Sequence, residues 1–240
     1  MSSNSLAVEA SLTSEAPEQK FRPLAPAWHT VAVLAVIGIS AYNGMQRAAQ
    51  LRGTGNLYRM TIYLHTIRFE WLMLALVLFG LWRGRSPLFE VLGERWRSVR
   101  QFLFDAGIGL LLLVVTIVVS SIAGGHTSGR DPAVQFLLPQ SGREIAMWVL
   151  LSFSAGVCEE AVYRGYLRKQ FMAWTRSAAA GIVLSGMLFG AAHIYQGLGH
   201  AAVIALTGVT AGVAAHWRRS VRPGMIAHTL QDVLGGLLNH

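Results

Sequence analysis

The residues best suited to carry out chemistry are charged and imidazole side chains that interrupt long apolar stretches. One stretch contains the run Cys158–Arg164, with the letters CEEAVYR. A charge in an apolar environment is costly, so this cluster needs partners or a function. On a helix, Glu160 and Arg164 lie four apart on one face and can form an ion pair. Glu159 lies about 100° around the helix, closer to Tyr163, and is left free to act as a base.

Two further apolar stretches carry the other candidates. One ends in Phe189-Gly-Ala-Ala-His193, and the other contains His228-Thr-Leu-Gln-Asp232. A single histidine or a single His/Asp pair is more often a structural, hydrogen-bonded contact than a functional site. Together with Glu159, however, these side chains form a set able to activate water and stabilise an oxyanion, or to bind a metal.

The elements that must position these residues are membrane-spanning helices. Of the 240 residues, 53% are hydrophobic and only 13% are charged, whereas a soluble domain carries about a quarter charged residues. Spans of about 20 apolar residues are needed to cross a bilayer, and each must be helical. We therefore expect an all-α, polytopic transmembrane bundle of about seven spans: Trp28–Met45, Ile62–Trp82, Phe102–Ala123, Ile145–Leu167, Ser177–Tyr195, Gly199–Trp217 and Gly224–Asn239.

Three regions follow from this pattern. Residues 1–27 are polar and predict a disordered cytoplasmic tail, and residues 28–144 predict amino-terminal helices with an interfacial connector. Residues 145–240 contain the four candidate catalytic residues and are expected to form the catalytic core. The connector is Leu88–Arg100, where Leu88, Leu92 and Trp96 recur at helical spacing and predict a helix on the membrane surface.

Lysine and arginine in the loops predict the orientation. They are frequent in 83–100, 168–176 and 218–222 and sparser in the intervening loops, although Arg47, Arg52 and Arg59 disagree. The positive-inside rule then places the amino terminus in the cytoplasm. The same rule explains the net charge of +8 without nucleic acid as a partner. The expected location is the cell (inner or plasma) membrane, with the lipid bilayer as surroundings.

The three motifs together resemble those of a known family. Glu159-Glu160-x-x-x-Arg164, Phe189-x-x-x-His193 and His228-x-x-x-Asp232 are similar to the ordered motifs of the CPBP family (CAAX proteases and bacteriocin-processing enzymes, also called Abi). The resemblance covers about Ile145–His240. It implies an intramembrane endopeptidase, a hydrolase acting on a membrane-associated protein or peptide.

The resemblance also implies roles for single residues. Glu159 would deprotonate water with help from His193, while His228 and Asp232 would stabilise the oxyanion. Glu160, Arg164, Phe189 and Tyr163 would support the site. The prenyl endopeptidases have asparagine where this chain has Asp232. An ionised aspartate repels an oxyanion, so Asp232 must be protonated, orient His228 or bind a cation. Prenylation of the substrate therefore stays open.

A metalloprotease mechanism is a further alternative. A divalent metal, with zinc as the candidate, would be bound by Glu159, His193, His228 and Asp232. Helix depths give mixed support for one site: at 1.5 Å per residue, Glu159 and Asp232 lie about 13 Å into their spans but His193 about 24 Å. The fifth span must therefore enter the membrane later, or kink near its glycines at 181, 186 or 190.

Other functions leave weaker traces. The zinc protease motif H-E-x-x-H and the aspartyl motif Gly-x-Gly-Asp are absent, and a Ser185/His228 dyad would leave Glu159 without a role. Cys158 has a neutral flank and is expected to be a packed small residue. The non-enzymatic alternatives are a cation or metal transporter and an immunity-type protein that only binds a partner. A transporter would place polar residues along a path across the membrane, and the earlier spans contain residues that such a path could use: His65, Arg68, Glu70 and Asp105.

Overall fold

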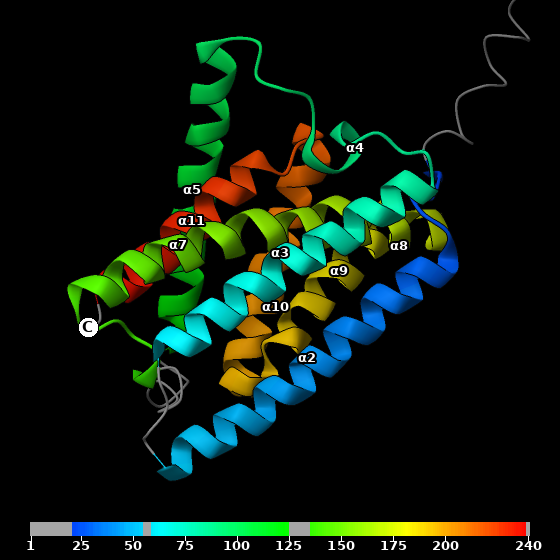
Figure 1. Ribbon diagram of the computed structural model, residues 1–240. Helices are drawn as coiled ribbons and strands as arrows, with labels where there is room; N and C mark the ends of the chain where they lie inside the picture. The colour runs from blue at the N-terminus through cyan, green and yellow to red at the C-terminus, as the bar shows by residue number, and fades with distance from the viewer. Residues whose placement is uncertain (1–20, 55–58, 125–134, 239–240) are drawn as a thin grey trace, which may run out of the picture.

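The chain folds into a bundle of helices (Figure 1). The computed structural model describes residues 21–54, 59–124 and 135–238, and these residues contain no β-strand. The elements are α2 (Ala27–Thr54), α3 (Arg59–Arg83), α4 (Phe89–Leu92), α5 (Val99–Gly124), α7 (Gly142–Glu159), the π-helix η2 (Glu160–Leu167), α8 (Arg168–Thr175), α9 (Ala178–Ala192), the 3-10 turn η3 (Ile194–Gln196), α10 (Leu198–Arg218) and α11 (Arg222–Leu237). The prediction of an all-α fold is confirmed.

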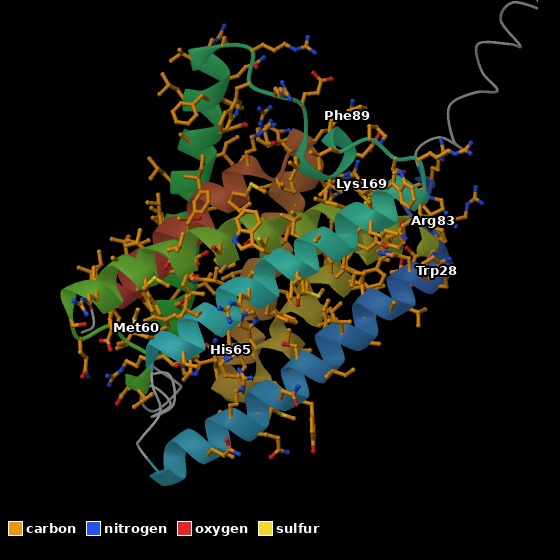
Figure 2. All side chains as sticks on the ribbon, in the orientation of Figure 1. Trp28, Met60, His65, Arg83, Phe89 and Lys169 are labelled. Carbon is orange, nitrogen blue, oxygen red and sulfur yellow. The ribbon has the colours of Figure 1, made fainter. Side chains whose placement is uncertain are left out.

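The long helices run back and forth between two ends of the bundle. At one end, Lys169 forms an ion pair with Glu90 and the Arg222 guanidinium donates to the Glu94 carbonyl. At the opposite end, the Tyr63 hydroxyl donates to the Leu137 carbonyl. Figure 2 shows Trp28, Arg83, Phe89 and Lys169 gathered at the first end and Met60 at the second. The segments 83–100, 168–176 and 218–222 thus share one end, called here the arginine-rich end.

Four helices are long and apolar enough to cross a membrane: Arg59–Arg83, Val99–Ile122, the continuous Gly142–Thr175 and Leu198–Arg218. Each of the seven predicted spans falls on a helix, but α2, α9 and α11 do not meet the same criteria of length and hydropathy. The protein is therefore an integral membrane protein with several apolar helices, and the count of about seven spans stays a prediction.

The helix that contains the fourth predicted span explains why Glu159 and His193 were predicted at different depths. It does not end at Leu167 but continues through η2 and α8 to Thr175. Glu159 lies 16 residues before Thr175, and His193 lies 16 residues after Ser177, which caps α9. Both are therefore about 24 Å from the arginine-rich end. The fifth span needs neither a late start nor a kink. The predicted depths differed because the end of the fourth span was wrongly placed at Leu167.

The predicted disordered tail is too long at its carboxyl end. Residues 1–20 of that tail lie outside the described residues. Leu24 and Ala25 are buried, the Leu24 N–H donates to the Gln170 side chain (2.6 Å), and the Ser86 hydroxyl donates to the Leu24 carbonyl (2.8 Å). These contacts fix the segment before α2 against α8, a long-range interaction that local composition does not reveal.

The predicted surface helix over Leu88–Arg100 is also wrong in extent. Only α4, a single turn at Phe89–Leu92, is helical before α5 begins at Val99. Gly93 ends the turn with a φ of +84°, a conformation that glycine adopts at little cost. A Cβ there would collide with Ser220, so Gly93 also lets this segment approach the turn between α10 and α11.

Glycine also allows the close packing of α9 and α10. Gly208 lies against Gly186, and Gly212 lies against Ile182. The absence of side chains at Gly208 and Gly212 therefore lets α9 and α10 approach closely. This contact holds α9, and with it His193, beside the rest of the bundle.

Candidate active site

Glu159 lies at a change in helix geometry. It is the last residue of α7, and the eight residues after it form the π-helix η2, in which the N–H of Arg168 bonds to the carbonyl of Tyr163. A π-helix takes more residues per turn than an α-helix and is frequently found at functional sites. The sequence argument assumed regular α-helical spacing here, so it did not predict this feature.

The predicted ion pair between Glu160 and Arg164 is confirmed. The Arg164 guanidinium lies 3.1 Å from Glu160 Oε1, and both side chains are about 2–3% exposed. The guanidinium also stacks over the Phe189 ring at 3.9 Å, and Tyr163 packs edge-on against the same ring at 5.0 Å. The predicted supporting residues therefore form one buried layer that joins η2 to α9.

The structure brings the four predicted catalytic residues together from three helices. Glu159 Oε1 lies 4.0 Å from His193 Nε2, and Glu159 Oε2 lies 3.6 Å from His228 Nε2. Asp232 Oδ2 lies 3.6 Å from the same His228 nitrogen. Glu159 Oε2 is buried and has no hydrogen-bond partner among the described residues. The cluster therefore places the Glu159 carboxylate between two imidazoles, with one oxygen facing each ring.

Glu160 has a second contact that the sequence argument did not assign. Its Oε1 lies 3.4 Å from Nδ1 of His228, so the carboxylate that pairs with Arg164 also faces the histidine. A carboxylate at one imidazole nitrogen fixes the ring orientation and the position of its proton. Glu160 therefore links the ion pair to the candidate catalytic groups.

The orientation of His193 follows from its position at the end of α9. Its Nδ1 lies 2.8 Å from the carbonyl oxygen of Phe189. A carbonyl can only accept a hydrogen bond, so Nδ1 carries the proton. In the neutral ring, Nε2 is then an acceptor, and this is the nitrogen that faces Glu159. The Phe189 ring packs against the rings of both His193 (4.7 Å) and His228 (5.9 Å).

Sequence reasoning missed Glu70 as a member of this cluster. The sequence argument named it only as a residue that a transport path could use, yet it is buried at mid-α3 and its carboxyl hydrogen-bonds to the Glu159 carboxyl. It is also close enough to Asp232 to interact electrostatically. The signal was present in the sequence as an acid within an apolar span. What the sequence could not show is that α3 packs on α7 with this face inward.

Several other singled-out residues lie elsewhere. Asp105 accepts two hydrogen bonds from Arg218 at the arginine-rich end, and His65 and Arg68 are exposed on α3. Ser185 donates to the Ile182 carbonyl, which gives no support to a serine/histidine dyad. Cys158 is fully buried, as expected for a packed small residue. Glu70 thus lies with the four predicted catalytic residues, whereas Asp105, His65 and Arg68 lie apart from them.

The candidate metal site finds no support in the side-chain arrangement. Among the described residues, no group of three or more His, Cys, Asp or Glu side chains is placed to bind one metal ion. The donor types suit zinc, but the observed positions do not form a ready coordination shell. We therefore derive no step through a metal.

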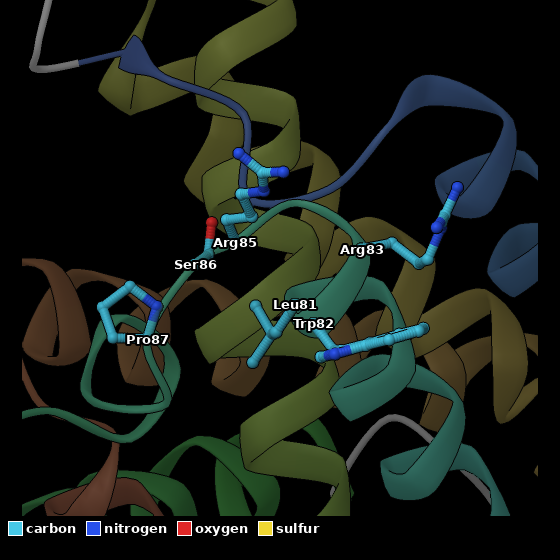
Figure 3. Close-up of a pocket in the computed structure, with 6 residues that line it drawn as sticks. All are labelled: Leu81, Trp82, Arg83, Arg85, Ser86 and Pro87. Carbon is cyan, nitrogen blue, oxygen red and sulfur yellow. The ribbon is translucent and has the colours of Figure 1, made fainter.

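A hollow of about 840 Å³ lies beside the turn from α3 to α4 and is not the site. Leu81 to Arg83 and Arg85 to Pro87 line it, as Figure 3 shows. It contains no carboxylate or imidazole that could move a proton.

Comparison with known proteins agrees with this geometry. Residues 141–234 match the family model of the type II CAAX prenyl endopeptidases, described as Rce1-like. This segment is Rce1-like. The CPBP resemblance based on the three motifs is thereby confirmed over about two fifths of the chain. No curated protein and no solved structure matches the chain significantly.

The Rce1-like segment contains α7, η2, α8, α9, α10 and most of α11, and so all four predicted catalytic residues. The similarity of this segment to a CAAX protease family supports an intramembrane protease, a hydrolase that acts on a membrane-associated protein. Glu70 lies on α3, outside the Rce1-like segment.

Proposed function

We propose that the protein is an intramembrane endopeptidase that hydrolyses a peptide bond of a membrane-associated protein or peptide, in CAAX-type or related processing. The observation that carries the proposal is the convergence of Glu159, His193 and His228 from three helices, with the acid 4.0 Å and 3.6 Å from the two imidazoles. Such separations leave room for a reacting water, and catalytic hydrogen bonds are often long in a free enzyme.

The first step assigned to Glu159 is removal of a proton from water. Its Oε2 has no hydrogen-bond partner among the described residues and is free to accept that proton. His193 Nε2, an acceptor in the neutral ring, assists by binding the same water. The resulting hydroxide attacks the carbonyl carbon and forms a tetrahedral oxyanion. Glu159 then returns the proton to the leaving amine, and the C–N bond breaks.

His228 is proposed to stabilise the oxyanion through Nε2. Glu160 at Nδ1 and Asp232 beside Nε2 favour a ring that carries protons on both nitrogens. Such an imidazolium can keep Nδ1–H on Glu160 and donate Nε2–H to the oxyanion. Asp232 then acts by orienting and polarising His228, which suits the presence of an acid where the prenyl endopeptidases have asparagine.

The test compares newly formed protein ends in membranes of cells making the wild-type chain or Glu159→Ala at equal abundance. We expect a set of cleaved ends that requires Glu159, and their sequences identify the substrate class, including whether a prenylated cysteine lies near the cleaved bond. Glu94→Ala is the matched control, because Glu94 is an exposed acid in an ion pair at the arginine-rich end. If the wild type and Glu159→Ala gave the same ends, the proposal would fail.

Glu160→Ala separates the supporting role from the chemical one. The change leaves Arg164 buried without its partner, and breaking a buried pair costs about 3–5 kcal/mol. We expect a lower unfolding temperature as well as lost cleavage, whereas Glu159→Ala loses cleavage with little change in unfolding temperature. Equal melting of all three proteins would contradict the division of roles.

A further inference from the structure

A basic groove lies at the arginine-rich end, away from the candidate active site. It encloses about 950 Å³ between residues 94–105 and the turn from α10 to α11. Six arginines line it, at positions 95, 97, 100, 218, 219 and 222, against two acids, Glu94 and Asp105. The groove therefore carries an excess of four positive charges.

Both acids are already engaged by the protein. Asp105 is buried and accepts hydrogen bonds from Arg218 and from the Trp96 indole (2.8 Å), and Glu94 pairs with Arg97 at 2.7 Å. Arg222 donates to main-chain carbonyls and stacks over the Trp96 ring at 5.0 Å. These contacts hold the walls of the groove in place.

The other three arginines form no ion pair within the described part of the chain: Arg95, Arg100 and Arg219. All three are exposed. A rigid wall with several cations that have no carboxylate partner is suited to a ligand with a compact negative charge.

The rim of the groove is apolar. Leu103 is 61% exposed, Phe104 51% and Trp96 40%. Leu103 and Phe104 lie near the start of α5, a helix long and apolar enough to span a membrane. Exposed aliphatic and indole side chains at a helix end mark the boundary between hydrocarbon and headgroups. The groove therefore has basic walls on its aqueous side and apolar contacts on its bilayer side.

We propose that this groove binds the phosphodiester headgroup of an anionic phospholipid, with the acyl chains lying against the apolar rim. Basic pockets between membrane helices bind such headgroups, and each arginine near the surface contributes about 1 kcal/mol. The apolar rim favours a lipid over a soluble phosphate or an acidic peptide, neither of which would bury it.

The experiment measures binding of dioleoyl phosphatidylglycerol and dioleoyl phosphatidylcholine to the purified full chain in detergent, by native mass spectrometry. We expect the wild type to retain phosphatidylglycerol preferentially. The double variant Arg95→Gln with Arg100→Gln should bind it roughly 25-fold more weakly, at roughly fivefold for each arginine. Binding of phosphatidylcholine should be unchanged.

Arg83→Gln with Arg85→Gln is the matched control. It removes the same charge at the same end of the bundle, but from the hollow beside the turn from α3 to α4 (Figure 3). This variant should bind phosphatidylglycerol as the wild type does. Equal weakening by both variants would show that surface charge alone attracts the lipid, and no weakening by the groove variant would overturn the site.

Competition with soluble anions distinguishes the sources of negative charge. Inorganic phosphate or a polyglutamate peptide at the same concentration should leave phosphatidylglycerol bound. If either displaced the lipid, the groove would recognise a free anion or an acidic peptide, and the lipid proposal would be wrong. Circular dichroism of each variant confirms that the helices are retained.

Discussion

At the scale of single residues, the candidate site is a set of acids and imidazoles in which each group is oriented by another. Glu160 connects the Arg164 guanidinium to Nδ1 of His228, and the Phe189 carbonyl fixes the proton on His193. Glu159 Oε2 and Glu160 Oε2 both lack a hydrogen-bond partner among the described residues, but Glu160 forms an ion pair with Arg164, whereas Glu159 faces His193 and His228 and has no arginine partner. This difference supports Glu159, and not its neighbour Glu160, as the proposed base.

Glu70 extends the site beyond the matched family segment, and its role can be tested by substitution. Its carboxyl hydrogen-bonds to that of Glu159, so we infer that it positions the base. Glu70→Leu removes this bond, and we expect the cleavage rate to fall by about tenfold to a hundredfold. Glu70→Gln should retain more activity than Glu70→Leu, because an amide N–H can also donate to the Glu159 carboxylate. The measurement is the rate of substrate cleavage at equal amounts of folded protein.

A purely structural role for Glu70 makes a different prediction. Loss of packing would lower the unfolding temperature of both variants in parallel with their rates. Wild-type cleavage by Glu70→Leu would show that this side chain only fills space.

At the scale of helices, the site depends on how closely α11 approaches α7 and η2. Gly156 on α7 lies against Thr229 of α11, and Gly224 of α11 lies against the Glu160 carboxylate. A Cβ at Gly224 would be 3.0 Å from Glu160 Cδ and still closer to Oε2. The missing side chain at this position therefore lets Glu160 reach His228.

Gly224→Ala should consequently weaken the site although alanine is the better helix former. We expect the carboxylate of Glu160 to be displaced, at a cost of about 1–3 kcal/mol for overpacking. The unfolding temperature and the cleavage rate should both fall. Gly107→Ala on α5 is the control, because nothing lies within 4 Å of its added Cβ, and it should be neutral or stabilising. Full activity in Gly224→Ala would mean that Glu160 can shift without disturbing His228.

At the scale of the whole molecule, the two halves of the chain share one site. The Rce1-like segment supplies the predicted catalytic residues, while α3 from the other half brings Glu70 and packs along α7. The Trp71 indole also donates to the Ser154 hydroxyl (3.1 Å), which ties the same two helices together. The amino-terminal helices therefore do more than anchor the protein.

The gathering of arginine-rich loops at one end predicts the orientation of the whole bundle. The positive-inside rule places this end in the cytoplasm. In a Cys158→Ala background, Leu88→Cys should react with a membrane-impermeant thiol reagent only after cells are opened, and Gln140→Cys should react in intact cells. Both positions are exposed and lie at opposite ends. The reverse labelling pattern would invert the orientation.

The sequence by itself determined the all-α fold class and the apolar helices, and it proposed the four candidate catalytic residues. Apolar helices in a membrane protein follow from composition, and a pair such as Glu160 and Arg164 follows from spacing along one helix. Local spacing does not report where a helix ends when the next residues are also apolar, which is why Glu159 and His193 were predicted at different depths. The continuation to Thr175 places them at the same depth.

Only the tertiary structure decided the contacts between helices. The proximity of Glu70 to Glu159, the π-helix after Glu159 and the contact of Gly224 with Glu160 depend on which helix faces pack together. The basic groove likewise forms because Gly93 lets residues 93–98 fold against the turn from α10 to α11. Each of these features joins segments far apart in the chain, so no periodicity along a single segment could have revealed them.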